Sequence, residues 1–462
     1  MMRHLYLATA ALALATPASA ANAPGDWHSK GRELLENAIN IPSVTTRPDE
    51  VKKLVAYLKG EFEKGGFTDI HVKDHDGTQS LIVRWSAAGT PKKKPMLLIG
   101  HMDVVDAKRD DWSRDPFKMV EEDGYFYGRG TTDMKNGIVA ITNALLWLKA
   151  DGFKPKRDII VFFSGDEETD GNGARRAATE WRKLVDAEFA LNADAGGGAF
   201  TKDGTPLGFG IQTSEKMYQS FTFTARNPGG HSSRPRADNA IYDLAGALKR
   251  LEAHRFTPML NETTRAYFQY RQKQEKGPLG DAMRRWLANE ADGAAADIIE
   301  ADPLEVAMTR TRCVATRLEG GHADNALPQT AKALVNCRIF PGVAASAVQA
   351  ELQAAAGSGV VVEPFGVSNP SPPSPLRPDI IKAFTDSLHK RHPGAEIVPQ
   401  MSTGATDGLF FRATGMPVYG VSGAWIISPE DERAHGKDER IPVKSFYEDL
   451  DHWRDIVKAL AQ

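Results

Sequence analysis

The chain has few cysteines and no excess of positive charge. Its 462 residues include two cysteines, and 57 lysines and arginines stand against 60 aspartates and glutamates, which gives a net charge of −3. Neither cysteine has a Cys or His neighbour at zinc-finger spacing, and the charge balance provides no basic face for nucleic acid. With 41% hydrophobic and 25% charged residues, the composition is typical of a soluble globular protein without a nucleic-acid partner.

Two common sequence signatures of enzymes are also absent. Gly128-Arg129-Gly130 lacks the third glycine of a dinucleotide-binding fingerprint and the lysine of a P-loop. Gly420-Val421-Ser422-Gly423 is followed by Ala424, so it is not the Gly-x-Ser-x-Gly elbow of a serine hydrolase. The sequence therefore gives no support to nucleotide-dependent or serine-hydrolase chemistry.

The first twenty residues have the pattern of a secretory signal peptide. Residues 1–4 give a short basic start, residues 5–15 are apolar, and Ala18-Ser19-Ala20 is a small-residue cleavage signal. The apolar stretch is too short to span a bilayer as a mature helix, and no cysteine nearby could carry a lipid. We expect cleavage after Ala20 and a periplasmic or secreted protein without a stable membrane anchor.

Five potential metal ligands are spread along the chain, and four of them follow a predicted strand. The clearest strands are residues 96–99, 159–163 and 189–191, apolar runs of the kind that a parallel sheet covered on both faces requires. Ligand sites of open α/β sheets lie beyond the carboxyl ends of such strands. Two imidazoles and three carboxylates suit a pair of zinc-like ions and metal-assisted hydrolysis. The five residues are His101, Asp133 (after a weaker strand candidate, 125–127), Glu168, Asp194 and, in a loop, His435.

Four short motifs, followed by His435, occur in the order found in a known family. The order resembles the co-catalytic zinc family of aminoacylases, acetylornithine deacetylase, succinyl-diaminopimelate desuccinylase and glutamate carboxypeptidase, from about Arg32 to the C-terminus. The resemblance implies an α/β catalytic domain with a mostly parallel central sheet, two zinc ions for which cobalt or manganese can substitute, and a homodimer. The motifs are His101-Met102-Asp103-Val104-Val105, Gly128-Arg129-Gly130-Thr131-Thr132-Asp133-Met134-Lys135, Asp166-Glu167-Glu168 and Gly229-Gly230-His231-Ser232.

The resemblance implies a role for each residue of this centre. Asp133 resembles the bridging ligand, with His101 and Asp194 completing one zinc site and Glu168 and His435 the other. Asp194 stands where some relatives carry glutamate. In the family the peptide bond after the bridging aspartate is often cis, so the bond between Asp133 and Met134 is expected to be cis.

Two more residues are expected to serve catalysis. Asp103 resembles the carboxylate that orients the imidazole of His101, and Glu167 resembles the general base. The implied mechanism is attack of a metal-bridging hydroxide on an amide carbonyl, with Glu167 accepting the proton of the water and then protonating the departing amine.

At this length the chain should divide into two domains. Apolar alternation and helical spacing after residue 216 indicate a βαββαβ order, a ferredoxin-like α+β unit that matches the lid and dimerisation domain of the family. The stretch 255–307, with a helical segment at 279–291, is expected to be an insertion in this lid. We expect a signal peptide at 1–20, the catalytic domain at 21–213 and 367–462, and the lid at 214–366.

Substrate recognition is expected from the lid and from a later loop. His231 resembles the histidine that acts across the subunit interface of dimeric relatives and steadies the oxyanion, and Asn325 resembles the asparagine that assists substrate binding. Arg338 resembles the arginine that clamps a substrate carboxylate, which guanidinium geometry suits. The loop that contains Gly404 is expected to add backbone donors. A free carboxylate favours peptides or N-acyl amino acids, so a carboxypeptidase, a dipeptidase and a deacylase all fit.

Two other functions are compatible with parts of the sequence. A non-catalytic, metal-dependent peptide-binding protein would use the same ligands but would have no need of Glu167. A two-zinc aminopeptidase would lack a lid that carries His231 and Arg338. We therefore favour an exported amide hydrolase over both.

The two cysteines lie on predicted consecutive strands, 311–318 and 332–340. Positions symmetric about the connecting loop can face each other in an antiparallel pair, so a disulfide between Cys313 and Cys337 fits an oxidising compartment. We favour two buried free thiols, because cross-strand geometry is strained for a disulfide.

Overall fold

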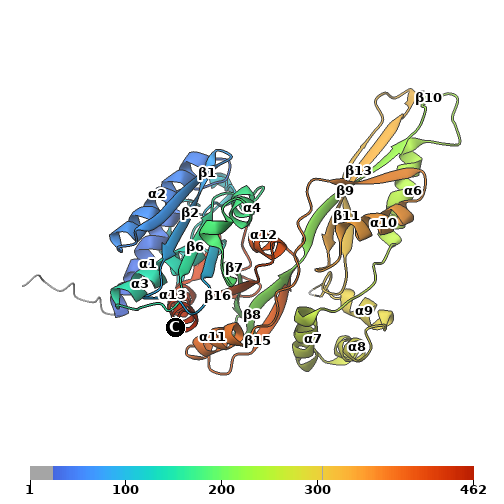
Figure 1. Ribbon diagram of the computed structural model, residues 1–462. Coiled ribbons are helices and arrows are strands. Elements are labelled where there is room, and N and C mark those ends of the chain that lie inside the picture. Colours follow the sequence, from blue (N-terminus) through green and yellow to red (C-terminus); the bar gives the residue numbers. More distant parts are fainter. Residues whose placement is uncertain (1–23, 304) are drawn as a thin grey trace, which may run out of the picture.

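The computed structural model describes residues 24–303 and 305–462. The expected signal peptide, residues 1–20, lies outside the described residues. The chain forms a larger α/β part and an elongated second part, and long strands connect the two parts (Figure 1). No helix in the two described ranges combines the length and the apolar character needed to span a bilayer.

The larger part is built on an eight-stranded sheet with the order β1-β2-β6-β3-β7-β16-β8-β15. The four central neighbours β6, β3, β7 and β16 run parallel, whereas β1 and β2 are antiparallel at one edge. This arrangement confirms the expected mainly parallel sheet. The strands are β1 (Asp69–His75), β2 (Thr78–Trp85), β3 (Met96–His101), β6 (Ile159–Ser164), β7 (Phe189–Phe200), β8 (Pro206–Glu215), β15 (Ile397–Ser402) and β16 (Val418–Ile427).

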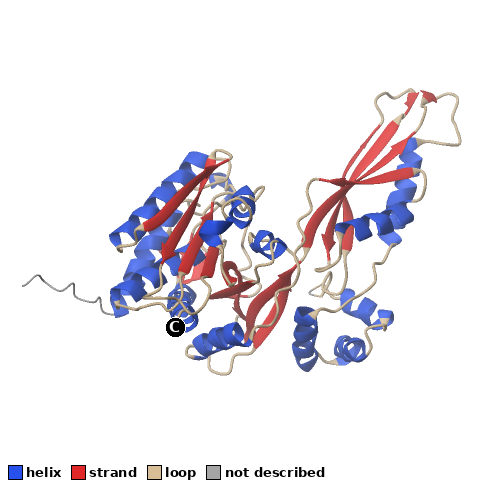
Figure 2. Cartoon of the chain, in the orientation of Figure 1, coloured by secondary structure: helices blue, strands red, loops and turns tan. Residues whose placement is uncertain are grey.

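Helices cover both faces of this sheet (Figure 2). Successive side chains of a buried strand point to opposite faces, so Leu98 packs in one apolar cluster and its neighbour Leu97 in another. The helices on the Leu98 side are α1 (Pro24–Ile39), α2 (Pro48–Lys64), α3 (Lys135–Ala150), α11 (Pro378–His389) and α13 (Val443–Leu460). Those on the Leu97 side are α4 (Asn172–Ala178), α5 (Arg182–Val185) and α12 (Gly408–Ala413).

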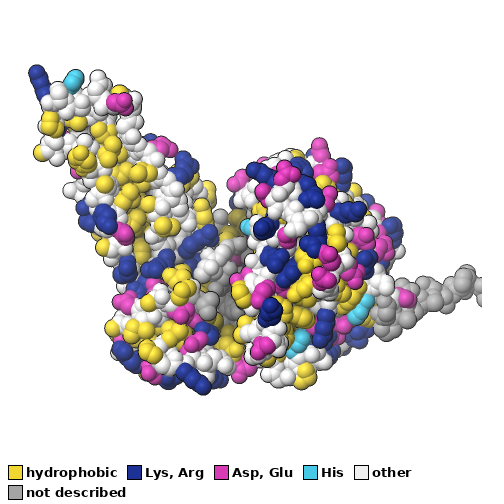
Figure 3. Space-filling view, turned by 180° about the vertical axis from the view of Figure 1, so that it is seen from behind, with side chains coloured by type: hydrophobic (Ala, Val, Ile, Leu, Met, Phe, Trp, Pro, Cys, Tyr) yellow, Lys and Arg dark blue, Asp and Glu magenta, His cyan; other side chains and the backbone are white. Residues whose placement is uncertain are grey.

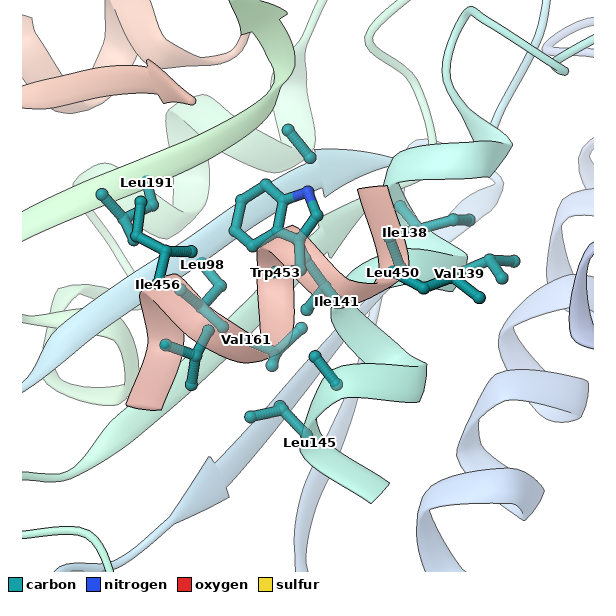
Figure 4. Packing of buried hydrophobic residues seen from close by; sticks show 14 of the residues in the cluster. Leu98, Ile138, Val139, Ile141, Leu145, Val161, Leu191, Leu450, Trp453 and Ile456 are labelled. Atoms are coloured by element: carbon teal, nitrogen blue, oxygen red, sulfur yellow. The ribbon is translucent and has the colours of Figure 1, made fainter. Parts of the chain in front are cut away.

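The last helix belongs to the same core as the first strands of the parallel sheet. Trp453 of α13 is fully buried between the sheet and α3 (Figure 4). Burying such an aromatic side chain removes on the order of 150 to 250 Å² from water. The chain therefore returns to the larger part after it has formed the second part. The neighbours of Trp453 in this cluster include Leu98, Ile138, Ile141, Leu145, Val161, Leu191, Leu450 and Ile456.

A buried acid in this core gives a test of stability against pH. The Oδ1 atom of Asp449 accepts a hydrogen bond from the Gly423 amide at 2.7 Å, and its Oδ2 atom has no partner among the described residues. Burial raises the pKa of Asp449 to about 7. The folded state therefore binds this proton more tightly than the unfolded chain does, and the cost of the buried charge is present above pH 7 and declines as the pH falls toward the unfolded pKa.

We expect Asp449→Asn to stabilise the protein at pH 8, by about 1 to 3 kcal/mol, because the amide oxygen keeps the Gly423 bond and carries no charge. The gain should shrink at pH 5, where the native carboxyl is protonated. Urea unfolding of both proteins at the two pH values measures this difference. Asp386→Asn, on the surface of α11, is the matched control for the loss of one charge. A gain that does not change with pH would contradict the account.

The second part, here called the lid, contains a four-stranded antiparallel sheet with the order β11-β13-β9-β14. The helices α6 and α10 pack on one face of it, which is the predicted ferredoxin-like arrangement. The chain crosses from the central sheet to the lid at Lys216, between β8 and β9. The elements are β9 (Met217–Arg226), α6 (Ala240–Ala253), β11 (Arg312–Gly320), β13 (Thr330–Ile339), α10 (Ala345–Ala356) and β14 (Val360–Phe365).

Cys313 and Cys337 form a disulfide between β11 and β13, so our expectation of two free thiols is wrong. The two residues pair directly in the antiparallel register, with Cα atoms 4.0 Å apart. A bulge between Ala315 and Arg317 shifts this register by one residue. Without the bulge, Cys313 would pair with Arg338, and this bulge could not be deduced from the strand pattern.

The insertion, residues 255–307, folds as a group of three helices below the lid (Figure 1). The predicted helical segment 279–291 corresponds to α8 (Gly277–Ala288). Two other helices, α7 (Glu262–Gln274) and α9 (Gly293–Glu300), were not predicted. Helix α7 was not predicted because its sequence is polar and few apolar residues mark its buried face. The helix α7 lies against β15 of the central sheet, so the insertion contacts the larger α/β part as well as the lid.

Candidate metal centre

Three parallel strands bring their ligands together. In the register of the sheet, His101 at the end of β3 pairs with Ser164 at the end of β6, and Glu167 and Glu168 follow Ser164 after two residues. Ile99 pairs with Asn192, so His101 and Asp194 are neighbours two residues further along. Asp194 lies within β7 rather than beyond its end, because β7 continues to Phe200.

Asp133 reaches the centre from a different direction. The strand β5 (Tyr125–Tyr127) that precedes it pairs with β4 (Val120–Glu122) and β17 (Arg440–Pro442) in a separate small sheet. Asp133 lies in the loop between β5 and α3, and its peptide bond to Met134 is cis, as expected. The weak strand prediction was therefore correct, but the strand does not belong to the central sheet.

The five ligand candidates meet in two groups that share Asp133. The Nε2 atom of His101 is 3.1 Å from Oδ1 of Asp133 and 3.6 Å from Oδ1 of Asp194. The Nε2 atom of His435 is 3.0 Å from Oδ2 of Asp133 and 3.1 Å from the Glu168 carboxylate. In each group, the potential ligand atoms lie within 4.8 Å of one another. One carboxylate oxygen of Asp133 therefore faces each histidine, the arrangement that a bridging ligand requires.

Electrostatics favour a cation between these groups. Burial, together with the nearby Asp133 carboxylate, raises the pKa of Glu168 to about 7. Burial also raises the pKa of Glu167 well above its ordinary value. The hydrogen bond to Asp133 raises the pKa of His435 to about 9. Two imidazoles and three carboxylates that converge in this way are a donor set that fits a pair of divalent cations.

The carboxylate of Asp103 forms hydrogen bonds with groups other than the expected His101 imidazole. The backbone carbonyl of Asp103 accepts the hydrogen bond from Nδ1 of His101, at 2.9 Å, whereas the Asp103 carboxylate oxygen is 3.7 Å from that nitrogen. The carboxylate instead accepts the backbone amides of Glu167 and Glu168, at 3.1 and 3.0 Å, and the hydroxyl of Thr45. Asp103 thus orients His101 through its main chain and fixes the Glu167–Glu168 turn through its side chain.

Glu439 organises the loop that carries Asp133 and was not predicted. Its buried carboxylate accepts the backbone amides of Gly130, Thr132 and Asp133 at 2.8 to 3.0 Å and pairs with Arg129 at 2.7 Å. In the sequence it stands in the charged run Lys437-Asp438-Glu439-Arg440, which is typical of a solvated turn. Its position four residues after His435 is the only feature of the sequence that could have linked Glu439 with the metal centre.

A cavity of about 640 Å³ opens between this centre and the lid. Glu167, Glu168 and His435 line it on the side of the central sheet, and Arg338 lines it on the lid side. The Arg338 guanidinium lies 4.9 Å from the centre of the Tyr218 ring, and no described carboxylate forms an ion pair with it. The predicted loop residue Gly404 also lines this cavity, although its amide donates to Ser402 Oγ at 3.1 Å.

His231 and Asn325 are not part of this cavity. His231 lies on β10 (Gly230–His231), which pairs with β12 (Ala326–Leu327), and the carbonyl of Asn325 accepts the amide of Ser232 at 3.0 Å. Both residues are exposed at the tip of the lid, far from the metal centre of their own chain (Figure 1). The structure therefore brings the two residues to each other but not to the other predicted site residues.

Comparison with known proteins gives matches over most of the chain. The profile of Peptidase family M20/M25/M40 matches residues 97–459. Human N-fatty-acyl-amino acid synthase/hydrolase PM20D1 is 30% identical over 446 residues, which cover 90% of this chain and 84% of the human protein.

Two solved structures share the fold. The M20 family metallo-carboxypeptidase Sso-CP2 from Sulfolobus solfataricus is similar with a TM-score of 0.68 at 19% identity, over 93% of this chain and 98% of that chain. The YXEP protein of Bacillus subtilis, a dinuclear metal-binding peptidase from the M20 family, is similar with a TM-score of 0.61 at 13% identity, over 95% and 98%.

Proposed function

The chain belongs to peptidase family M20/M25/M40 and is a hydrolytic enzyme, and we propose that it cleaves the amide bond of N-acyl amino acids or peptides that carry a free carboxylate. The observation that carries this proposal is the shared cavity of Arg338, Glu167, Glu168 and His435. Arg338 has no carboxylate partner within the described chain, so it can bind the carboxylate of a substrate whose amide bond lies at the metal centre.

Two zinc ions are the proposed cofactors, with cobalt or manganese as substitutes. His101, Asp133 and Asp194 would hold one ion, and Asp133, Glu168 and His435 the other. Imidazole and carboxylate ligands are common in zinc sites. When bound, such ions supply Lewis acidity and make a water molecule acidic enough to attack at neutral pH.

Glu167 is the proposed general base. Its carboxylate lies with His101 and Glu168 in a further group of ligand atoms within 4.8 Å of one another, and Glu167 lines the substrate cavity. The Asp103 carboxylate holds the Glu167 amide. This side chain can therefore accept the proton of the attacking water and deliver it to the departing amine.

The substrate class can be tested through Arg338. Arg338→Gln should lower kcat/KM for N-acyl amino acids by about 100-fold, the order expected when a hydrogen bond to a charged group is lost. It should leave the slower hydrolysis of the matching C-terminal amides almost unchanged. Amine release from both substrate series measures the effect.

Arg312→Gln is the matched control for this variant. Arg312 pairs with Arg338 on the neighbouring strand but does not line the large cavity, so its loss should spare both series. Equal losses on free and amidated substrates in Arg338→Gln would contradict the carboxylate clamp.

We further propose a homodimer in which His231 and Asn325 complete the active site of the partner. Their exposure at the lid tip, away from their own metal centre, supports this. The lid also carries exposed hydrophobic residues of the kind that an interface buries. Hydrophobic side chains form a band along the lid on the face seen in Figure 3. Over the lid as a whole, the exposed hydrophobic residues include Tyr242, Val314, Leu318 and Val361.

Export to the periplasm or the medium is also proposed. It is supported by the basic start, the apolar stretch and the small-residue cleavage signal of residues 1–20. The Cys313–Cys337 disulfide is compatible with an oxidising compartment.

A further inference from the structure

A second cavity lies on the other side of the metal centre. It has a volume of about 340 Å³ and adjoins Asp194, not Glu168 and His435. We call it the Asp194 hollow. Its lining residues include Asp194, Gln212, Tyr267, Met308, Met401 and Thr406.

The helical insertion supplies one wall of the Asp194 hollow. Tyr267 comes from α7, and Met308 directly follows the insertion. Met308 belongs to an apolar cluster with Phe268 and Trp286 of the insertion and Met401 of β15. A buried hydrogen bond of 2.7 Å between the hydroxyls of Thr213 and Thr263 ties α7 to β8. The wall is thus held against the catalytic sheet and does not depend on the position of the lid tip.

The lining combines apolar contacts with one unused donor. Methionine side chains adapt their shape to flexible apolar groups, and Met308 and Met401 are both largely buried here. Gln212 is 2% exposed. Its Oε1 accepts from Arg412, but its Nε2 has no hydrogen-bond partner among residues 24–303 and 305–462. A buried N–H donor beside apolar side chains suits a ligand in which a carbonyl oxygen adjoins an apolar chain.

The positions of the two cavities indicate which end of the substrate lies on which side of the metal centre. Thr406 lines both of them, and proposed ligands border each one, Glu168 and His435 the large cavity and Asp194 the hollow, so the two cavities adjoin each other at the metal centre. Arg338 lies in the large cavity on the Glu168 and His435 side. If the substrate carboxylate binds there, the acyl half must leave the centre on the opposite side, which is the side of Asp194.

We propose that the Asp194 hollow binds the acyl half of the substrate and that the insertion makes it selective for unbranched apolar acyl chains. This inference rests on the proposed amide hydrolysis and adds a specificity site to it. Tyr267, Met308 and Met401 form the apolar contact, and Gln212 offers its N–H to an oxygen of the acyl group.

The test compares N-acetyl, N-octanoyl and N-dodecanoyl derivatives of one amino acid. In the native enzyme, kcat/KM should rise from acetyl to octanoyl. Met308→Trp should fill the hollow and lower kcat/KM for the octanoyl and dodecanoyl substrates by about tenfold, with little change for the acetyl substrate. Met259→Trp, the same substitution at a site 38% exposed in the adjoining insertion, should change none of them.

Because a tryptophan at the buried Met308 site can disturb the fold, Met308→Ala provides a second test. The enlarged hollow should shift the preference from octanoyl toward dodecanoyl. Unchanged chain-length preference in both Met308 variants, or the same change in Met259→Trp, would overturn the inference. Turnover of the acetyl substrate without any chain-length preference in the native enzyme would overturn this inference but not the proposed amide hydrolysis. No turnover of any of the three substrates would contradict the proposed hydrolysis of N-acyl amino acids, on which the inference rests.

Discussion

Glu167→Gln is expected to lower the rate of amide hydrolysis by about a thousandfold, within the range that one general base contributes. Glutamine has nearly the same shape as glutamate but cannot accept the proton of the attacking water. Glu167 is not needed to complete either group of proposed ligands around Asp133, so metal content should stay at the native level. Steady-state amine release and elemental analysis of the same preparation test both halves of this expectation.

Glu168→Gln is the contrasting variant. Glu168 adjoins Glu167 in sequence, but its carboxylate faces His435, so its replacement should reduce metal binding and activity together. Loss of bound metal from Glu167→Gln to the same extent would show that Glu167 is a ligand and would contradict its role as a base.

Mixed dimers of two inactive variants should recover about a quarter of the native activity, if His231 serves the site of the partner. A dimer of one Glu167→Gln subunit and one His231→Ala subunit contains one site with both defects and one site with none. Random assembly of equal amounts gives half mixed dimers by symmetry. Half of the dimers are therefore mixed, and half of the sites in each mixed dimer are intact, which gives a quarter of the native activity. Activity after subunit exchange measures this recovery.

The controls for this experiment are each variant exchanged with itself, which should remain inactive. Mixed dimers that are verified by two affinity tags but show no activity would contradict the trans role. In that case His231 would act within its own chain, and the lid would have to bend its exposed tip to the metal centre.

The sequence predicted those parts of the site that depend on short apolar strands and ordered motifs. His101, Glu168 and Asp194 follow from strands whose burial on both faces is visible as continuous apolar runs. The ferredoxin-like order of the lid followed from the alternation and helical spacing of its segments. Such features are local, so a single sequence contains them.

Long-range side-chain contacts could not be predicted in the same way. Glu439 binds the Asp133 loop across more than 300 residues of sequence, and nothing in its charged neighbourhood marks it as buried. The carboxylate of Asp103 accepts the Glu167 amide and does not bind the imidazole of the nearby His101. The sequence places Asp103 close to His101, and only the folded structure shows which of the two groups its carboxylate binds. The helix α7 has so few apolar residues that its contact with β15 was not visible in its spacing.

The most direct test of the central claim is amine release from an N-acyl amino acid by protein that has been stripped with a chelator and then titrated with zinc. We predict no measurable hydrolysis before zinc is added, and activity that rises until two ions are bound per chain and then stays constant. Full activity in the stripped protein, with metal content shown to be zero, would contradict the proposed two-ion centre of His101, Asp133, Glu168, Asp194 and His435.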